Sequence, residues 1–135
     1  MPLPTILVVD DHTDSRTICE IILARNGYTI LSAADGSHAL ELARSQAPEA
    51  IILDIALPRM DGWTVIEELK KEPGTAGIPI VMYTAHSLEA YRTRALGLGC
   101  VAYLVKPCSP QAILEAVQGC FPGGPSADPL IARAV

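Results

Sequence analysis

The amino-acid sequence predicts an α/β protein in which a parallel five-stranded sheet lies between two layers of helices. Short apolar segments rich in Ile, Val and Leu alternate five times with longer segments whose apolar residues recur at helical spacing. Strict alternation of strand and helix implies parallel strands with right-handed crossovers. The 135 residues are half apolar but only 4% aromatic, which indicates one domain with an aliphatic core.

The first half of the chain contains three predicted strands and two predicted helices. The strands are expected at 5–9, at 28–33 on an edge of the sheet, and from Ala50 to the aspartate Asp54. The first helix is expected at 15–26, with a stop at Gly27 and with apolar positions at Ile18, Ile21, Ile22 and Ala24. The second begins with a cap within Asp35-Gly36-Ser37 and closes before Pro48, and its buried positions are Ala39, Leu40 and Ala43.

The second half continues the alternation. Helices are expected at 63–71, ended by Glu72-Pro73-Gly74, and at 88–96, ended by Gly97 and Gly99. Strands are expected at 78–83 and 100–105. Ser109 caps a final helix that has Pro110 at its first position and buries Ala112, Ile113, Ala116 and Val117. We therefore expect one domain at 1–120, followed by a flexible tail or the start of a linker at 121–135, where Pro and Gly gather.

The composition excludes several classes of function. The net charge is −5, the pI is about 5.0, and the ten basic residues are scattered, which argues against a nucleic-acid surface or an anionic membrane surface. The N-terminal apolar run at 6–9 is too short for a signal peptide or a membrane span, so we expect a cytoplasmic protein. The four cysteines show neither zinc-ligand spacing nor a disulfide framework.

Polar side chains follow four of the five predicted strands, and they carry the chemistry of this sequence. They are Asp10 and Asp11 after the first strand, Asp54 after the third, Thr84 after the fourth and Lys106 after the fifth. The carboxyl ends of parallel strands meet at one edge, where ligands bind. Two like charges near 4 Å repel by about 4 kcal/mol at an effective dielectric of 20, so the cluster calls for a cation or for a raised pKa of one carboxyl group. Oxygen ligands favour Mg²⁺, and a neighbouring lysine and hydroxyl favour phosphoryl transfer with Asp54 as nucleophile.

These residues stand in motifs that resemble a known family. The motifs are Val8-Val9-Asp10-Asp11, the segment Leu53-Asp54-Ile55-Ala56-Leu57-Pro58-Arg59-Met60-Asp61-Gly62, Tyr83-Thr84-Ala85, and Tyr103-Leu104-Val105-Lys106-Pro107. Together they resemble the receiver domain of two-component response regulators over residues 4–120. The resemblance implies a three-layer, doubly wound, flavodoxin-like receiver fold with strand order 2-1-3-4-5.

The resemblance also implies a set of roles around the phosphoacceptor. Asp54 would accept a phosphoryl group from a sensor histidine kinase or a phosphotransfer protein. Mg²⁺, for which Mn²⁺ could substitute, would be bound by Asp11, Asp54 and the backbone carbonyl of Ala56, and through water by Asp10. Lys106 would pair with the phosphoryl oxygens.

The resemblance assigns further residues to transmitting the signal and to setting the rate of dephosphorylation. Thr84 would move to hydrogen-bond the phosphoryl group, and Tyr103 would rotate inward. Ala56 and His86 occupy the two positions that tune dephosphorylation. No helix-turn-helix or catalytic domain follows these motifs, so we expect a stand-alone regulator that signals through protein contacts, although the chain could equally be part of a longer regulator or hybrid kinase. The resemblance implies that it contacts a downstream protein through the face of the last two helices and the last strand. It does not imply direct nucleic-acid or membrane binding.

Two other classes of function remain open at this point. Haloacid-dehalogenase-like phosphohydrolases also place a nucleophilic aspartate after a buried strand, but they carry a second aspartate two residues later, where this chain has Ala56. A receiver-like binding module that no longer uses phosphate would not need all five polar residues. The leading hypothesis is therefore a switch that catalyses its own phosphorylation and dephosphorylation and turns over no external substrate.

Overall fold

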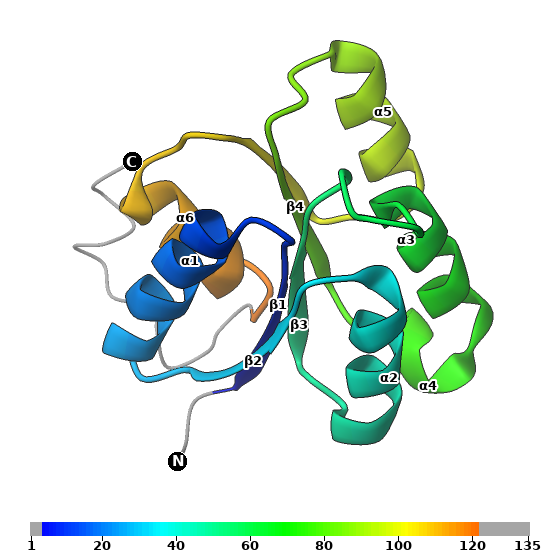
Figure 1. Ribbon diagram of the computed structural model, residues 1–135, viewed down its shortest axis with the longest axis horizontal. Coiled ribbons are helices and arrows are strands. Elements are labelled where there is room, and N and C mark those ends of the chain that lie inside the picture. The colour runs from blue at the N-terminus through cyan, green and yellow to red at the C-terminus, as the bar shows by residue number, and fades with distance from the viewer. Residues whose placement is uncertain (1–3, 122–135) are drawn as a thin grey trace.

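Five parallel strands form the centre of the computed structural model, which describes residues 4–121 (Figure 1). They are β1 (Thr5–Val9), β2 (Thr29–Ala33), β3 (Ala50–Leu53), β4 (Ile80–Thr84) and β5 (Ala102–Val105). Their order in the sheet is β2-β1-β3-β4-β5, and all neighbouring pairs are parallel. The predicted fold class and strand order are confirmed, and β2 lies at an edge as expected. The tail expected from 121 onward lies, beyond Phe121, outside the described residues.

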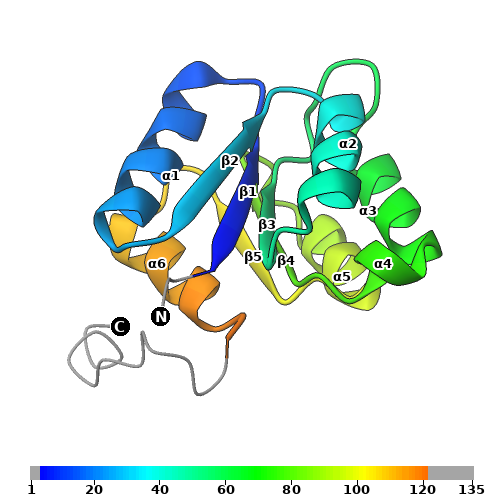
Figure 2. The same ribbon diagram turned by 90° about the horizontal axis from the view of Figure 1, so that it is seen from below.

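Helices cover both faces of this sheet, as Figures 1 and 2 show. One face carries α1 (Thr13–Arg25) and α6 (Pro110–Gln118), and the other carries α2 (Gly36–Gln46), α3 (Gly62–Lys71), α4 (Pro73–Ala76) and α5 (Glu89–Gly97). Within residues 4–121, no helix has the length and apolar character needed to cross a bilayer. The predicted three-layer architecture is therefore present.

The two central strands β1 and β3 are buried on both faces, which explains their continuous apolar sequences. Successive side chains of a strand point to opposite faces, so Leu7 packs toward the layer of α2 and α3 while Ile6 and Val8 pack toward α1 and α6. This double burial holds the ends of the central strands in place. The residues that directly follow these strands are therefore also held in fixed positions.

Three of the helices begin at side chains that cap the free backbone N–H groups of the first turn. Asp35 accepts a hydrogen bond from the His38 N–H at 2.8 Å, and Ser109 accepts one from the Ala112 N–H at 3.1 Å, as predicted for α2 and α6. Asp61 caps α3 in the same way. These caps fix where the strand-to-helix connections end, and therefore how the edge of the sheet is shaped.

The predicted apolar face of α1 is wrong at three of its four positions, and only Ile22 of the four is partly buried against the core. Ile18 and Ile21 are 48% and 47% exposed, and Ala24 is also exposed, whereas Cys19 and Leu23 are buried. Apolar residues lie on two sides of this helix, so its periodicity alone fits more than one orientation. The side chains at i and i+4 that bury here are Cys19 and Leu23, which share one stripe.

One element was not predicted. The segment expected only to end α3 contains the short helix α4, in which Pro73 occupies the first turn. The buried Thr75 hydroxyl donates to the Leu69 carbonyl at 2.7 Å and ties this turn back to the end of α3. A turn of four residues is too short to show a helical period in sequence.

Gly62 permits the close return of the chain after β3, and its replacement by alanine is expected to be costly. A Cβ at this position would lie 2.5 Å from the Asp54 carbonyl oxygen and 2.8 Å from the Ile55 Cα. Backbone atoms cannot move aside without shifting the loop, so Gly62→Ala should lower the free energy of unfolding by about 2–3 kcal/mol, as overpacking does. Urea denaturation measures this loss.

Gly97→Ala is the matched control, because a Cβ there meets nothing within 4 Å. This residue ends α5, where alanine is the better helix former, so the free energy of unfolding should stay unchanged or rise by up to about 1 kcal/mol. Equal effects of the two substitutions would contradict the tight packing at Gly62.

Candidate functional site

The predicted site residues meet at the carboxyl edge of the sheet. Asp10 and Asp54 follow the central strands β1 and β3, Thr84 ends β4, and Lys106 follows β5. Asp10 and Asp54 are only 2% and 3% exposed, and Thr84 is fully buried. Two carboxylates this deeply buried require compensation for the loss of water.

Lys106 supplies that compensation. Its Nζ lies 2.6 Å from Asp10 Oδ2 and 2.8 Å from Asp54 Oδ2, and its side chain is 13% exposed. Burial disfavours the charged ammonium, but hydrogen bonds to Asp10 and Asp54 outweigh this effect and raise the pKa of Lys106 above its ordinary 10.5. The lysine is therefore a charged bridge between the two acids.

The backbone fixes the other oxygen of each acid. Asp54 Oδ1 accepts a hydrogen bond from the Ala56 N–H at 3.1 Å, and Asp10 Oδ1 accepts one from the His12 N–H at 2.9 Å. Arg16 holds the backbone at this point by donating from its guanidinium to the Asp10 carbonyl at 2.8 Å. Each carboxylate is thus held on one side by Lys106 and on the other by its own loop.

A small open pocket gives access to Asp54. Its volume is about 170 Å³, well below the roughly 300 Å³ at which sites for organic ligands begin, so it fits a group of phosphoryl size. Two small residues, Ala56 and Ala85, leave the aspartate accessible. The complete lining is His12, Ser15, Asp54, Ala56, Thr84, Ala85, His86 and Lys106.

The acidic residues fit a divalent cation. Asp10, Asp11, His12 and Asp54 each offer a ligand atom, and these atoms lie within 4.8 Å of one another. Three carboxylates and the Lys106 ammonium leave two negative charges, which a divalent ion would neutralise. Carboxylate oxygens are the ligands that Mg²⁺ prefers. Asp10 and Asp54 are the buried members of the set, and Asp11 and His12 are exposed.

His12 is the member of this group that sequence reasoning missed. Its Nδ1 lies 3.1 Å from Asp11 Oδ1 and 3.4 Å from Asp10 Oδ1. A signal was present in the sequence, because a histidine directly after two aspartates at a strand end shares their edge of the sheet.

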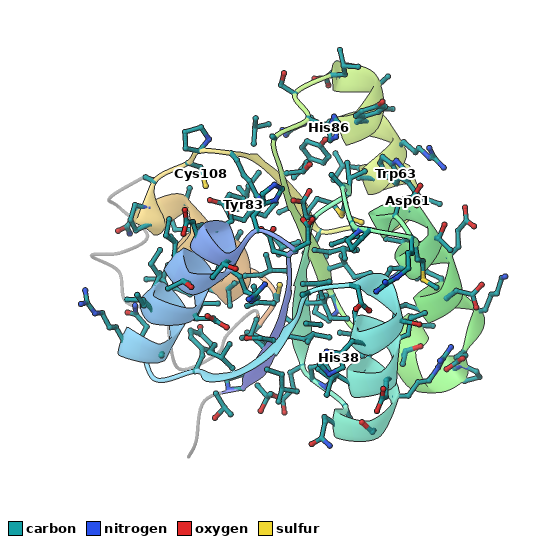
Figure 3. The ribbon with its side chains drawn as sticks, viewed as in Figure 1. His38, Asp61, Trp63, Tyr83, His86 and Cys108 are labelled. Carbon is teal, nitrogen blue, oxygen red and sulfur yellow. The ribbon has the colours of Figure 1, made fainter. Side chains whose placement is uncertain are left out.

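The predicted switch residues form a chain of hydrogen bonds beside the pocket. The Tyr103 hydroxyl donates to the His86 carbonyl at 2.7 Å, and the His86 N–H donates to Thr84 Oγ1 at 3.4 Å. The His86 ring packs edge-on against Tyr91, which packs edge-on against Trp63. Figure 3 shows His86 on the segment between β4 and α5, with Trp63 at the start of α3. Tyr103 is already buried, in contact with this loop rather than with the pocket.

Removing the Tyr103 hydroxyl tests the bond to this loop. Tyr103→Phe leaves the His86 carbonyl without its donor, so the free energy of unfolding should fall by about 1 kcal/mol. Tyr28→Phe is the matched control, because the buried Tyr28 hydroxyl has no hydrogen-bond partner among the residues that the structure describes. That substitution should leave stability unchanged or raise it. Thermal or urea unfolding measures both, and equal losses would contradict the Tyr103 assignment.

Comparison with known proteins identifies the family. Residues 6–118 match the response regulator receiver domain. The chain is 42% identical over 108 residues to a probable transcriptional regulator, ycf27, of Porphyridium aerugineum, covering 80% of this chain and 44% of the relative. It is 37% identical over 113 residues to the alkaline phosphatase synthesis transcriptional regulatory protein PhoP of Bacillus subtilis (strain 168), covering 84% and 46%. The chain thus spans less than half of these two relatives.

Solved structures agree. The chemotaxis response regulator CheY4 of Vibrio cholerae superposes with a TM-score of 0.82 at 28% identity, covering 88% of this chain and 99% of that one. A putative response regulator from Chloroflexus aurantiacus gives a TM-score of 0.82 at 32% identity, covering 87% and 96%. The fold, the clustered strand-end residues and these matches all lead to one conclusion: the chain belongs to the family of response regulator receiver domains.

Proposed function

We propose that Asp54 is the phosphoacceptor of a Mg²⁺-dependent switch. A sensor histidine kinase or a phosphotransfer protein would supply the phosphoryl group. The observation that carries this proposal is the bridge from Lys106 to two buried carboxylates, of which Asp54, together with Lys106, lines a pocket of phosphoryl size. Ionisable side chains that cluster in a cleft and interact with one another are typical of functional sites. The family to which the chain belongs transmits signals in this way.

In the proposed reaction, a carboxylate oxygen of Asp54 attacks the phosphorus of a phosphohistidine. An O–P bond forms and the P–N bond breaks with its electrons going to nitrogen, and the imidazole leaves neutral because its other ring nitrogen already carries a proton. Asp11, Asp54 and the Ala56 carbonyl would hold Mg²⁺, with Asp10 acting through water, and Mn²⁺ could substitute. When bound, the ion neutralises negative charge that develops on the transferring group.

Transfer changes the partners available to the neighbouring side chains. The Asp54 carboxylate becomes an acyl phosphate, so Lys106 exchanges its bond to Asp54 Oδ2 for a phosphoryl oxygen while keeping Asp10. The Thr84 hydroxyl, which lines the same pocket, donates to a second phosphoryl oxygen. His86 is bonded to both Thr84 and Tyr103, so a shift of Thr84 reaches Tyr103 through this loop. Ala56 and His86, which both line the pocket, would set how water reaches the phosphoryl group.

The proposed output is contact with a downstream protein in the cytoplasm, through the face made by α5, β5 and α6. This face carries large apolar side chains that remain exposed, among them Leu96, Val101 and Val105. Exposed apolar side chains that lie close together favour protein contacts. The net charge of −5 disfavours direct nucleic-acid binding by this segment. No turnover of an external substrate is expected.

The test is phosphorylation by a small phosphodonor. With acetyl phosphate and Mg²⁺, intact-mass spectrometry should show one added phosphoryl group, and removal of Mg²⁺ with a chelator should abolish it. Sustained hydrolysis of an added phosphomonoester would indicate a phosphohydrolase instead. Failure to bind Mg²⁺ together with failure to gain mass would indicate a phosphate-independent binding module. Either outcome would contradict the proposal.

Trp63 offers an optical test of the switch, because it is the chain's single tryptophan. Its ring contacts Tyr91 at 6.0 Å between centroids and lies 4.3 Å from the Arg94 Cζ, and Tyr91 contacts His86. We expect phosphorylation to change Trp63 emission beyond the effect of Mg²⁺ alone. Tyr91→Leu should suppress the change, because it removes the ring between Trp63 and His86. Identical emission from the phosphorylated and free wild-type protein would contradict this coupling.

A further inference from the structure

We propose that His12 makes the carboxylate centre a binding site for first-row transition-metal ions of the Co²⁺, Ni²⁺ and Zn²⁺ class. The inference rests on the proposed metal site and adds an imidazole nitrogen to it. Nothing in the family resemblance assigns a role to His12. The consequence would be competition between these ions and Mg²⁺ for the same carboxylates.

The geometry places His12 Nδ1 within the ligand group. It lies 3.1 Å from Asp11 Oδ1 and 3.4 Å from Asp10 Oδ1, and all four candidate ligand atoms lie within 4.8 Å of one another. Ligand atoms bound to one ion at about 2.0–2.2 Å are separated by roughly 3–4.5 Å. Small rotations of the side chains therefore suffice to close the group around an ion.

The Lys106 ammonium and the His12 ring contact different oxygens of the Asp10 carboxylate. Lys106 Nζ contacts Asp10 Oδ2, whereas His12 Nδ1 faces Asp10 Oδ1. Lys106 also occupies Asp54 Oδ2 and does not contact Asp11. An ion between Asp11, Asp10 Oδ1 and His12 thus lies away from the ammonium. This separation keeps the lysine bridge and the nitrogen ligand compatible.

His12 is anchored at its backbone, whereas its ring is largely exposed and contacts carboxylates of the ligand group. Its N–H donates to Asp10 Oδ1 at 2.9 Å, and its carbonyl accepts from the Arg16 N–H at 3.0 Å at the start of α1. The side chain is 65% exposed, so the ring can turn without breaking buried contacts. A surface ion pair with Asp11 is the alternative use of this histidine. That use would leave the metal preference of the site unaffected, and this difference can be measured.

The chemistry of the added nitrogen determines which ions benefit. Mg²⁺ binds oxygen and gives up its water reluctantly, so it gains little from an imidazole. Imidazole suits Zn²⁺, Ni²⁺ and similar ions, whose affinities for nitrogen and oxygen sites exceed those of Mn²⁺. His12 should therefore raise the affinity for Ni²⁺ while leaving the affinity for Mg²⁺ nearly unchanged.

The test compares Ni²⁺ and Mg²⁺ binding to the full chain and its His12→Ala variant. Ni²⁺ affinity is measured by competition with a chromophoric chelator, and Mg²⁺ affinity by displacement of Mn²⁺ observed by electron paramagnetic resonance. Removing a ligand should cost at least as much as removing an outer-shell partner, so Ni²⁺ affinity should fall by about 10- to 100-fold or more. Mg²⁺ affinity should change by less than about twofold. His38→Ala, which removes an exposed histidine outside the ligand group, should change neither.

Other outcomes would overturn the inference. Unchanged Ni²⁺ affinity in His12→Ala would show that the histidine is only a surface ion pair. An equal loss of Mg²⁺ and Ni²⁺ affinity would show that His12 confers no preference. Asp11→Ala should weaken both ions, and Ni²⁺ binding that survives it would place the ion elsewhere, for example at a thiol. Failure of the proposed function would appear separately, as missing phosphorylation of the wild-type protein in Mg²⁺.

Discussion

Lys106→Met is expected to lower the free energy of unfolding by about 3–5 kcal/mol when divalent cations are absent. The substitution leaves Asp10 and Asp54 buried without their shared counter-charge, and breaking a buried ion pair from one side typically costs this much. Urea denaturation in a chelating buffer measures the loss. Mg²⁺ should recover part of it, because an ion that binds the native state stabilises that state.

Two comparisons make this result specific. Lys71→Met removes an exposed pair with Glu68, at 3.0 Å, and should cost less than about 1 kcal/mol. Adding Asp54→Asn to Lys106→Met should restore part of the lost stability, because one of the two uncompensated charges is then gone while Asp10 stays buried without the lysine. A loss below about 1 kcal/mol for Lys106→Met, or a loss that Mg²⁺ does not reduce, would contradict the role given to the lysine.

The same contribution has a defined pH dependence. The pKa of Lys106 is raised in the folded protein, so its stabilising effect is complete below the ordinary value of 10.5 and is lost as pH rises through the folded value. The stability difference between wild type and Lys106→Met should therefore stay constant between about pH 7 and 9. It should shrink only above the ordinary lysine pKa. A difference that vanishes near neutral pH would contradict the raised pKa.

Asp54→Asn should abolish phosphoryl uptake while leaving the protein at least as stable. Asparagine keeps the shape of the side chain but lacks the nucleophilic carboxylate. It also removes one of three converging negative charges, while Lys106 keeps its partner Asp10 at 2.6 Å. The free energy of unfolding without divalent cations should therefore stay within about 1 kcal/mol of wild type or rise.

Asp61→Asn is the matched control for this substitution. Asp61 lies in the same loop and caps α3 by accepting from the Thr64 N–H at 2.9 Å, a role that asparagine fills about equally well. This variant should keep both phosphorylation and stability. Loss of phosphorylation in both variants would show that the loop, and not the Asp54 carboxylate, is what the chemistry requires.

The sequence predicted those features that follow from repeated, strongly patterned segments. β3 could be placed because its apolar run is continuous, rich in β-branched residues and bounded by Pro48 and Pro58. The convergence of Asp10, Asp54, Thr84 and Lys106 followed from parallel topology alone, since every strand ends at the same edge.

Other features depend on tertiary packing, which the spacing of apolar residues along the sequence does not determine. The buried side of α1 was predicted wrongly, because Ile18 and Cys19 lie on adjacent faces and only packing decides between them. The bridge from Lys106 to both acids depends on distances across the sheet between β1, β3 and β5. The place of His12 depends on how α1 begins after Asp11, which sets the direction of its ring.

The central claim is that Asp54 alone carries the phosphoryl group. The direct measurement is to treat the protein with acetyl phosphate and Mg²⁺, reduce the resulting acyl phosphate with borohydride, and locate the reduced residue by tandem mass spectrometry. Reduction is expected at Asp54 in the wild type, and none is expected in Asp54→Asn. Reduction at Asp10 or Asp11 in the wild-type protein, or any labelling that persists in Asp54→Asn, would contradict the central claim.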